Sequence, residues 1–150
     1  MSEYLETKID KFTFKVAIDR FYSTKGVWAS ATGNIVRIGL SDYLQQRSGD
    51  IAFAEIKPEG TTLVSGAEAA AIETIKVNLS LCSPVAGTII HINPLMETAP
   101  ETINLDPYGE GWLCEIEAVD WEADREDLLE PAAYFALVKR EAENEVKKND

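Results

Sequence analysis

The sequence predicts a mainly β fold, a sandwich or barrel of short strands followed by a C-terminal helix. Short apolar stretches alternate with turns rich in Gly, Pro, Ser and Asn from residue 27 to residue 116. This spacing is typical of an antiparallel sandwich or barrel. The chain has 150 residues, of which 45% are hydrophobic, and it therefore fits one domain with a core of ordinary size.

The N-terminal segment 1–20 is predicted to be an extension with one extra strand. Its first residues are polar, and Phe12, Phe14, Val16 and Ile18 then alternate with Lys11, Thr13, Lys15 and Ala17. A period of two indicates a strand with one buried face.

A hairpin, a short helix and a further strand are predicted next. The Gly33-Asn34 step suits a tight turn between two strands. Ser41 and Asp42 carry side-chain oxygens that can cap a helix through Gln46. The expected elements are strands at 27–31 and 35–40, the helix at 42–46, a strand at 51–56 and a turn at 58–60.

Short strands separated by turns continue to residue 116. Turns are expected at 64–66 and 83–87, a helical turn after Pro94, a surface loop at 97–111 and a last strand at 112–116. Residues 115–130 hold eight acidic side chains against one Arg, which indicates a solvated face or loop.

The C-terminal helix is predicted from Pro131, which suits a first helical position. Leu128, Ala132, Phe135 and Val138 share helical spacing, and we expect Phe135 to anchor the core. The chain is thus divided into an extension at 1–20, a main domain at 21–140 and a polar tail at 141–150 that frays.

Composition excludes several function classes. The net charge of −12 disfavours nucleic acid and anionic membrane surfaces as partners. The N-terminus lacks the basic and apolar regions of a secretory signal, so a cytoplasmic protein is expected. Cys82 and Cys114 are predicted to be buried reduced thiols, and His91 to occupy a half-exposed strand position. No familiar catalytic or metal-binding motif is present, so neither a catalytic residue nor a metal ligand is predicted.

Lys76 is the residue that stands out. It lies in Glu73-Thr-Ile-Lys-Val-Asn-Leu79, with Gly66 ten residues before it and Gly87 eleven residues after it. This near-symmetry predicts a hairpin with Lys76 at its exposed tip, where another enzyme can modify the amine.

The surrounding motifs resemble those of the glycine cleavage system H protein family. The sequence Glu73-Thr-Ile-Lys76, followed by Ser83-Pro-Val-Ala-Gly87, is similar to the family's lipoylation hairpin. The resemblance covers about residues 20–138, and its other motifs are Trp28, Gly33, Ile38-Gly39, Asp42-Tyr43, Gly49-Asp50-Ile51, Asn104 and Asp106-Pro-Tyr-Gly-Glu-Gly-Trp112.

The resemblance implies a hybrid barrel-sandwich like that of lipoyl domains. It also implies lipoate attached covalently to the Lys76 amine and recognition of Glu73 by a lipoate ligase or lipoyl transferase. The chain would then be a carrier that serves other enzymes, not an enzyme itself.

Our expectation for the cargo of the arm rests on two departures from the family pattern. Gly26-Val27 replaces the His-Glu that typically precedes the family tryptophan, and Val-Asn-Leu follows the lysine. Val27 cannot accept a hydrogen bond from an ammonium group, and Val-Asn-Leu is similar to the H-like lipoate-binding proteins of sulfur oxidation. Our leading interpretation is that subfamily, and the resemblance implies a heterodisulfide-reductase-like complex as partner. The alternatives are a glycine cleavage H protein, with the glycine cleavage enzymes and dihydrolipoyl dehydrogenase as partners, and an unlipoylated binding module.

Overall fold

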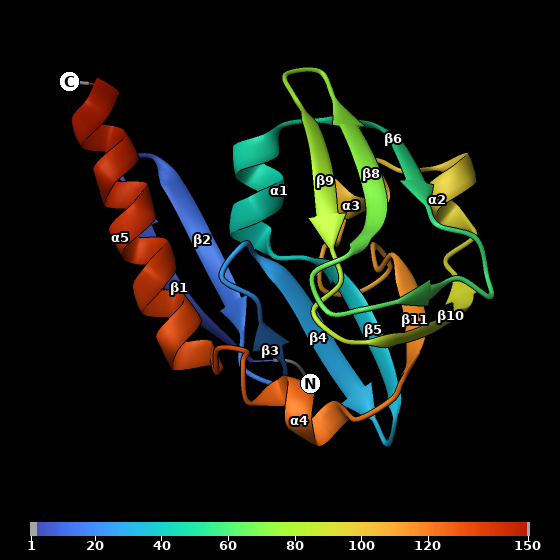
Figure 1. The fold of residues 1–150 in the computed structure, drawn as a ribbon. Helices are drawn as coiled ribbons and strands as arrows, with labels where there is room; N and C mark the ends of the chain where they lie inside the picture. The colour runs from blue at the N-terminus through green and yellow to red at the C-terminus, as the bar shows by residue number, and fades with distance from the viewer. Residues whose placement is uncertain (1–2, 150) are drawn as a thin grey trace.

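The computed structural model describes residues 3–149 as strands in three sheets with helices at the periphery (Figure 1). The strands are β1 (Tyr4–Ile9), β2 (Phe12–Ala17), β3 (Phe21–Tyr22), β4 (Val27–Thr32), β5 (Ile35–Leu40), β6 (Ile51–Ile56), β7 (Thr62–Leu63), β8 (Glu68–Thr74), β9 (Asn78–Cys82), β10 (Gly87–Ile92) and β11 (Cys114–Ala118). The helices are α1 (Asp42–Ser48), α2 (Leu95–Thr98), α3 (Thr102–Leu105), α4 (Trp121–Arg125) and α5 (Pro131–Asn149). No helix of this part of the chain is long and apolar enough to cross a membrane.

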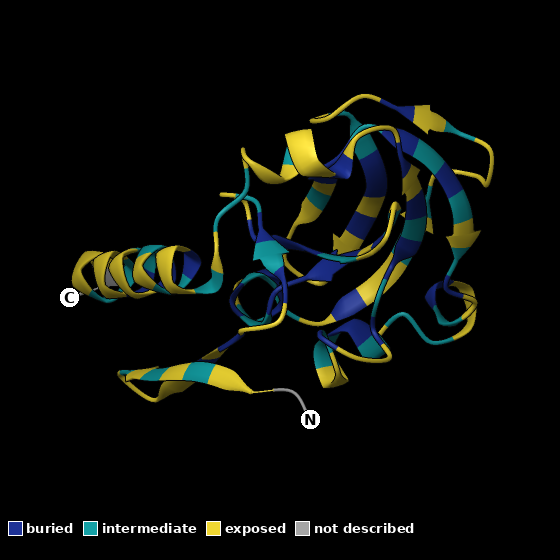
Figure 2. Cartoon of the chain, turned by 90° about the horizontal axis from the view of Figure 1, so that it is seen from below, coloured by how far each residue is buried: buried dark blue, intermediate teal, exposed yellow. Residues whose placement is uncertain are grey.

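Two of the sheets enclose the main core. One has the strand order β3-β4-β5-β11-β10-β7 and the other the order β6-β8-β9, and every pairing is antiparallel. Aliphatic side chains from both sheets meet between them, and buried positions are concentrated in these strands (Figure 2). The predicted mainly β barrel-sandwich is therefore confirmed.

Trp28 on β4 packs directly over Gly39 on the neighbouring strand β5. The two residues are direct partners in the register, and the buried indole covers the glycine. A Cβ atom on Gly39 would lie 2.5 Å from Cζ2 of Trp28, so a larger residue has no room. The indole Nε1 donates to the Pro107 carbonyl at 3.0 Å, and the Arg20 guanidinium lies 4.6 Å from the ring centroid. Gly39 thus leaves the space that the indole fills, and Pro107 and Arg20 hold the indole in place.

The N-terminal extension contains two strands, so the prediction of one extra strand was incomplete. β1 pairs with β2 in an antiparallel hairpin that is separate from the other sheets. The first residues were taken as merely polar, but Leu5, Thr7 and Ile9 alternate with exposed side chains and are half-buried. The hairpin packs against α1 and α5, and this tertiary contact was not visible in the sequence.

The segment 97–111 was predicted to be a surface loop, but part of it is helical. It contains α3, whose Ile103 is fully buried. The last strand, β11, begins at Cys114 and ends at Ala118, two residues later than expected. The acidic stretch after it includes α4, whose Trp121 is 8% exposed and belongs to the core. The composition of these two segments therefore did not predict their buried residues, Ile103 and Trp121.

The apolar stripe of α5 has a different phase from the predicted one. Tyr134, Val138 and Ala142 are buried, whereas Ala132 is exposed and Phe135, the expected anchor, is half-buried. The helix continues to Asn149, so the residues beyond Ala142 are helical and do not form a frayed tail. Its partner is the N-terminal hairpin, which contributes the buried Phe14 and Val16 to the same cluster.

Four buried tyrosines and Cys114 make stability sensitive to alkaline pH. Burial raises the pKa of Tyr43, Tyr108 and Cys114 to about 12, and it raises the pKa of Tyr22 and Tyr134 as well. In the unfolded chain these groups release protons near their ordinary pKa values of 9.0 for cysteine and 10.0 for tyrosine. Since the unfolded state loses its protons first, the free energy of unfolding falls as pH rises from about 9 to 12.

We expect the midpoint of thermal unfolding to drop steeply across that alkaline range and to vary much less between about pH 7 and 8.5. Circular dichroism melts at a series of pH values measure this. A melting temperature that stays level from about pH 9 to 11 would contradict the burial of these hydroxyls.

Candidate functional site

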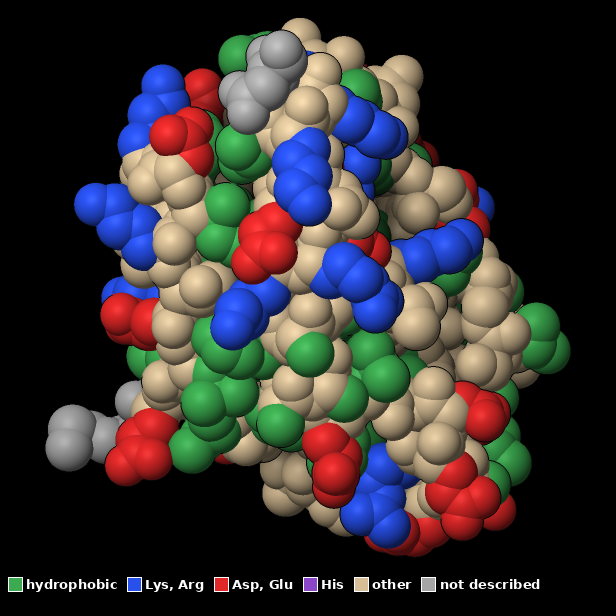
Figure 3. Space-filling model, turned by 90° about the vertical axis from the view of Figure 1, so that its left-hand side faces the viewer, with side chains coloured by type: hydrophobic (Ala, Val, Ile, Leu, Met, Phe, Trp, Pro, Cys, Tyr) green, Lys and Arg blue, Asp and Glu red, His purple; other side chains and the backbone are tan. Residues whose placement is uncertain are grey.

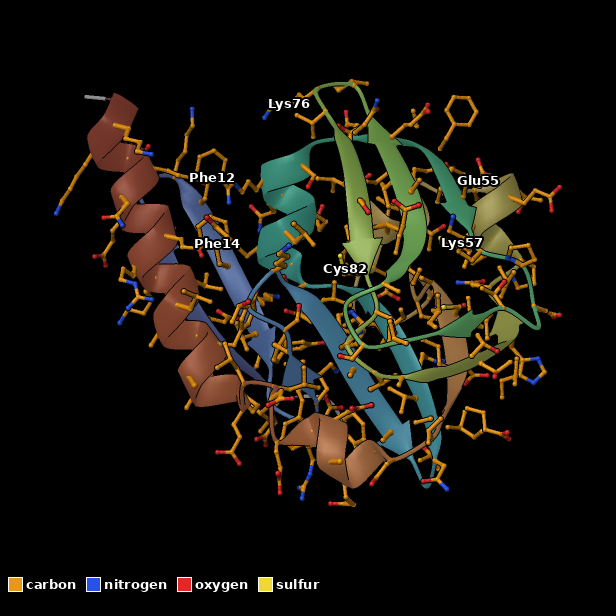
Figure 4. All side chains as sticks on the ribbon, in the orientation of Figure 1. Phe12, Phe14, Glu55, Lys57, Lys76 and Cys82 are labelled. Carbon is orange, nitrogen blue, oxygen red and sulfur yellow. The ribbon has the colours of Figure 1, made fainter. Side chains whose placement is uncertain are left out.

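Lys76 lies at the tip of the β8–β9 hairpin, as the spacing of glycines predicted. The strands are paired up to Glu73 and Asn78, and the tip projects away from the core (Figure 4). The Lys76 side chain is exposed, and its amine takes part in no ion pair with any residue from 3 to 149. The primary amine is therefore accessible to a modifying enzyme.

Thr74 holds the turn that presents Lys76. Its Oγ1 atom accepts hydrogen bonds from the backbone amides of Lys76 (3.1 Å) and Val77 (2.9 Å). The same hydroxyl donates to the Val77 carbonyl at 3.0 Å, and the Thr74 amide donates to that carbonyl at 2.9 Å. One side chain thus satisfies most of the backbone groups of a turn that contains no glycine.

Gly49 lies beneath the lysine stem. A Cβ atom on Gly49 would come within 2.9 Å of Cδ of Lys76, and the backbone φ of +89° also favours glycine there. The Ile75 amide donates to the neighbouring Asp50 carbonyl at 3.2 Å, which ties the hairpin tip to the end of α1. The stem of Lys76 is therefore placed by contact with a surface free of side chains.

Asn104 braces this surface from α3. Its Nδ2 donates to the Gly49 carbonyl and to Oε1 of Gln45, both at 3.0 Å, and its Oδ1 accepts from the Ile51 amide at 2.9 Å. Both donors and the carbonyl oxygen of the amide thus join α1, Gly49 and β6. Sequence reasoning gave Asn104 no role, although it belonged to the motifs that carried the resemblance.

Glu73 lies on the face of β8 that borders a cavity of about 910 Å³. The cavity is formed mainly by β6 and by the segment that leads into α2, with Phe53, Ile56 and Met96 among its lining residues. Phe53 is 66% exposed, and Ile75 and Val77 beside Lys76 are exposed as well. The tip thus offers a partner enzyme a carboxylate and apolar side chains next to the amine.

Comparisons with known proteins agree with this geometry. A sequence model of the family described as Glycine cleavage H-protein matches residues 20–141. The chain belongs to the glycine cleavage H-protein family. It is 39% identical over 117 residues to the glycine cleavage system H protein of Bacteroides fragilis (78% of this chain, 92% of the relative). It is 36% identical over 124 residues to that of Thermus thermophilus (83% and 96%).

A solved structure supports the fold of this family member. The crystal structure of a glycine cleavage system H protein from Mycobacterium marinum superposes with a TM-score of 0.71 and 28% identity. The match covers 78% of this chain and 94% of the other. The relatives are named for glycine cleavage, and none of these comparisons supports the sulfur-oxidation interpretation that the sequence analysis placed first.

Val27 is a core residue of β4. Its side chain is 1% exposed and belongs to the main core. The cavity next to Gly26, of about 250 Å³, is lined by Lys25, Arg47 and Glu141, and Val27 is not part of the lining. The carboxylate that borders this cavity comes from α5, and Glu141 lies 3.9 Å from the Arg47 guanidinium.

The other residues singled out in the sequence lie away from the hairpin tip. Cys114 is fully buried in β11, whereas Cys82 is only half-buried, at the end of β9 far from Lys76 (Figure 4). Cys82 therefore differs from the prediction of a buried thiol. His91 is exposed on β10, more than the expected half-exposed position, because this face of the edge region meets solvent.

We expect Thr74→Val to slow lipoylation of Lys76 several-fold, since the variant keeps the shape of the side chain but loses the hydroxyl that orders the turn. Thr74→Ser keeps the hydroxyl and serves as the matched control. Modification by a purified lipoate ligase, followed by intact mass, measures both. Equal rates for Thr74→Val and Thr74→Ser would show that the turn needs no hydroxyl.

Proposed function

We propose that this chain is a lipoyl carrier that transfers the glycine-derived aminomethyl unit between the enzymes of glycine cleavage. The observation that supports it most is the Lys76 amine, exposed at the tip of a hydrogen-bonded turn in a chain of the H-protein family. An attached lipoyl group supplies a dithiol that holds a reacting unit and carries electrons. The protein acts through placement of the arm and has no catalytic residue of its own in this proposal.

The residues around Lys76 fit such a group. The amine is free for an amide bond, and the Gly49 surface leaves the lysine stem unobstructed. Amide formation removes the positive charge of Lys76, and no ion pair from residues 3–149 is lost when it does. The tethered arm gains a high effective concentration at any enzyme that docks on the tip. The expected partners are a lipoate ligase or lipoyl transferase, the glycine cleavage enzymes and dihydrolipoyl dehydrogenase.

The cargo is tested by glycine-dependent bicarbonate exchange with purified glycine decarboxylase. The lipoylated chain, its unlipoylated form and the lipoylated Thermus thermophilus relative are compared at equal concentration. The proposal predicts exchange with the lipoylated chain that approaches that of the relative, and only background with the unlipoylated form. Lipoylated protein that supports no exchange would overturn the glycine assignment and return sulfur carriage with a heterodisulfide-reductase-like complex to first place.

Intact mass of the protein from its native host separates both carriers from an unlipoylated binding module.

Variants at positions 26 and 27 are unsuitable for the cargo question. Gly26 has a φ of +91°, and a Cβ atom there would lie 3.1 Å from Cβ of Leu44, so Gly26→His would strain the fold. Val27→Glu would place a carboxylate in the core, at a cost in stability.

Glu73 is proposed as a recognition residue for the lipoylating enzyme. It is exposed and three residues from Lys76, so its charge contributes little to folding. We expect Glu73→Gln to leave the melting temperature almost unchanged and to slow lipoylation. Glu59→Gln, on the far rim of the same cavity, is the matched control. Identical modification rates for Glu73→Gln and the parent chain would exclude the role.

A further inference from the structure

The N-terminal hairpin has one covered edge and one open edge. Side chains cover the outer edge of β2: the Lys15 amide donates to Oδ2 of Asp42 at 2.9 Å, Nε2 of Gln46 donates to the Thr13 carbonyl at 2.8 Å, and the Tyr108 hydroxyl donates to the Lys15 carbonyl at 2.7 Å. β1 pairs with β2 alone and forms the other edge.

The register shows which backbone groups line the open edge. Since Thr13 and Lys15 direct their backbone groups away from β1, the intervening Phe14 directs its groups toward β1, where Thr7 is its partner. Backbone direction alternates along a strand, so Glu6 and Lys8 present their amides and carbonyls outward. Within residues 3–149 these outward groups have no hydrogen-bond partner in another segment.

We propose that two copies of this chain associate through their β1 strands, in antiparallel pairing across a two-fold axis at Thr7. In this register Glu6 of each copy lies opposite Lys8 of the other, and Leu5 lies opposite Ile9. The pairing joins the two hairpins into one four-stranded sheet, and Glu6 and Lys8 exchange their outward backbone hydrogen bonds. A C2 contact requires a self-complementary surface, and the sequence of β1 has this property.

The register is selected by charge. Pairing centred on Glu6 would set Glu6 against itself, which is unfavourable. Pairing centred on Thr7 instead places each Glu6 between two lysines, because Lys15 of the same copy already lies 3.7 Å from it across the hairpin. Lys8 has Thr13 as its partner in the hairpin and gains a carboxylate only from the second copy.

The surroundings of the edge suit a second copy of a strongly acidic chain. The hairpin itself is electrically neutral, because residues 3–17 hold three acidic side chains and three lysines, so 3 − 3 = 0. The side of the molecule that bears α5 shows charges of both signs around a patch of apolar side chains (Figure 3). Leu5 and Ile9 are half-buried and Phe12 is 48% exposed, so each has apolar surface left to cover.

The contact is independent of the lipoyl site. The family match begins at residue 20, so the hairpin is an addition to the part of the chain that the family shares. Lys76 lies in the turn between β8 and β9, which belong to a different sheet from β1. Loss of the dimer therefore leaves lipoylation intact, and loss of lipoylation leaves the dimer intact.

A charge swap tests the pairing in the full-length chain. Analytical ultracentrifugation over a range of concentrations gives the dimer dissociation constant. Glu6→Lys and Lys8→Glu each create two like-charged pairs and should raise that constant about tenfold or more. The double variant restores both pairs between the copies, and an equal mixture of the two single variants forms a heterodimer with the same pairs. Both should recover most of the affinity of the parent, because only the Lys15 pair within the hairpin stays lost.

Glu126→Lys makes the same change of charge on the exposed end of α4 and should leave the constant unchanged. Hydrogen exchange gives a second readout, because the Glu6 and Lys8 amides should become protected as concentration rises. Equal lipoylation rates in all variants show that the fold is intact. A parent chain that stays monomeric at every concentration, or a double variant that fails to regain the affinity lost in the single variants, would overturn the proposal.

Discussion

Replacement of Lys76 by arginine is expected to abolish lipoylation and, with it, all carrier activity. A guanidinium keeps the positive charge but stays protonated under all working conditions, so it does not accept an acyl group. The Lys76 side chain is exposed and makes no ion pair with residues 3–149, so the variant should fold with an unchanged melting temperature.

Intact mass after incubation with a lipoate ligase measures the effect, and Lys57→Arg is the matched control. Lys57 is also exposed and lies just beyond β6, where it pairs with Glu68 at 3.4 Å (Figure 4). The parent and the control should each gain one lipoyl increment, and Lys76→Arg none. An increment on Lys76→Arg would place the modification on another lysine.

Gly39→Ala should destabilise the fold by about 3 kcal/mol, because the new methyl group would overlap a buried ring. The methyl carbon would lie 2.5 Å from Cζ2 of Trp28, which is 1% exposed and held by its bond to Pro107. The backbone at Gly39 is ordinary strand, so the expected loss comes from packing and not from strain in φ.

A double-mutant cycle with Trp28→Phe checks that cause. The smaller ring leaves room for the methyl group, so Gly39→Ala should cost much less in the Trp28→Phe background than in the parent. Urea unfolding gives the four free energies. Strictly additive losses would show that the glycine serves some purpose other than space for the indole.

Local patterns predicted the elements whose cause is local. The Gly33 turn, the Ser41 cap and the strand before Pro58 appear where expected, because turn geometry and capping depend on neighbouring residues. The phase of α5 and the strand β1 did not follow from pattern alone. Both depend on contact between the two ends of the chain, and that contact decides which side chains are buried.

Some residues of the candidate site could be predicted from the sequence, and others could not. Lys76 and Glu73 were found from motif and symmetry, because an exposed tip needs only a hairpin. Gly49 and Asn104 are brought to Lys76 by the ends of α1 and α3, through hydrogen bonds between segments 55 residues apart, and only the folded chain shows this. The expectation for the cargo rested on the place of Val27 in the motif, and the motif did not show that its side chain lies in the main core.

The burial and position of the two cysteine thiols decide whether they can react with a disulfide carried by the same chain. A thiolate attacks disulfides, whereas a protonated thiol does not, and burial raises the pKa of Cys114 to about 12. Cys114 is also fully enclosed, and Cys82 is half-buried at the end of β9 remote from the tip. In the proposed lipoylated protein neither thiol lies beside the group on Lys76, so we expect its exchange reactions to be left to the partner enzymes.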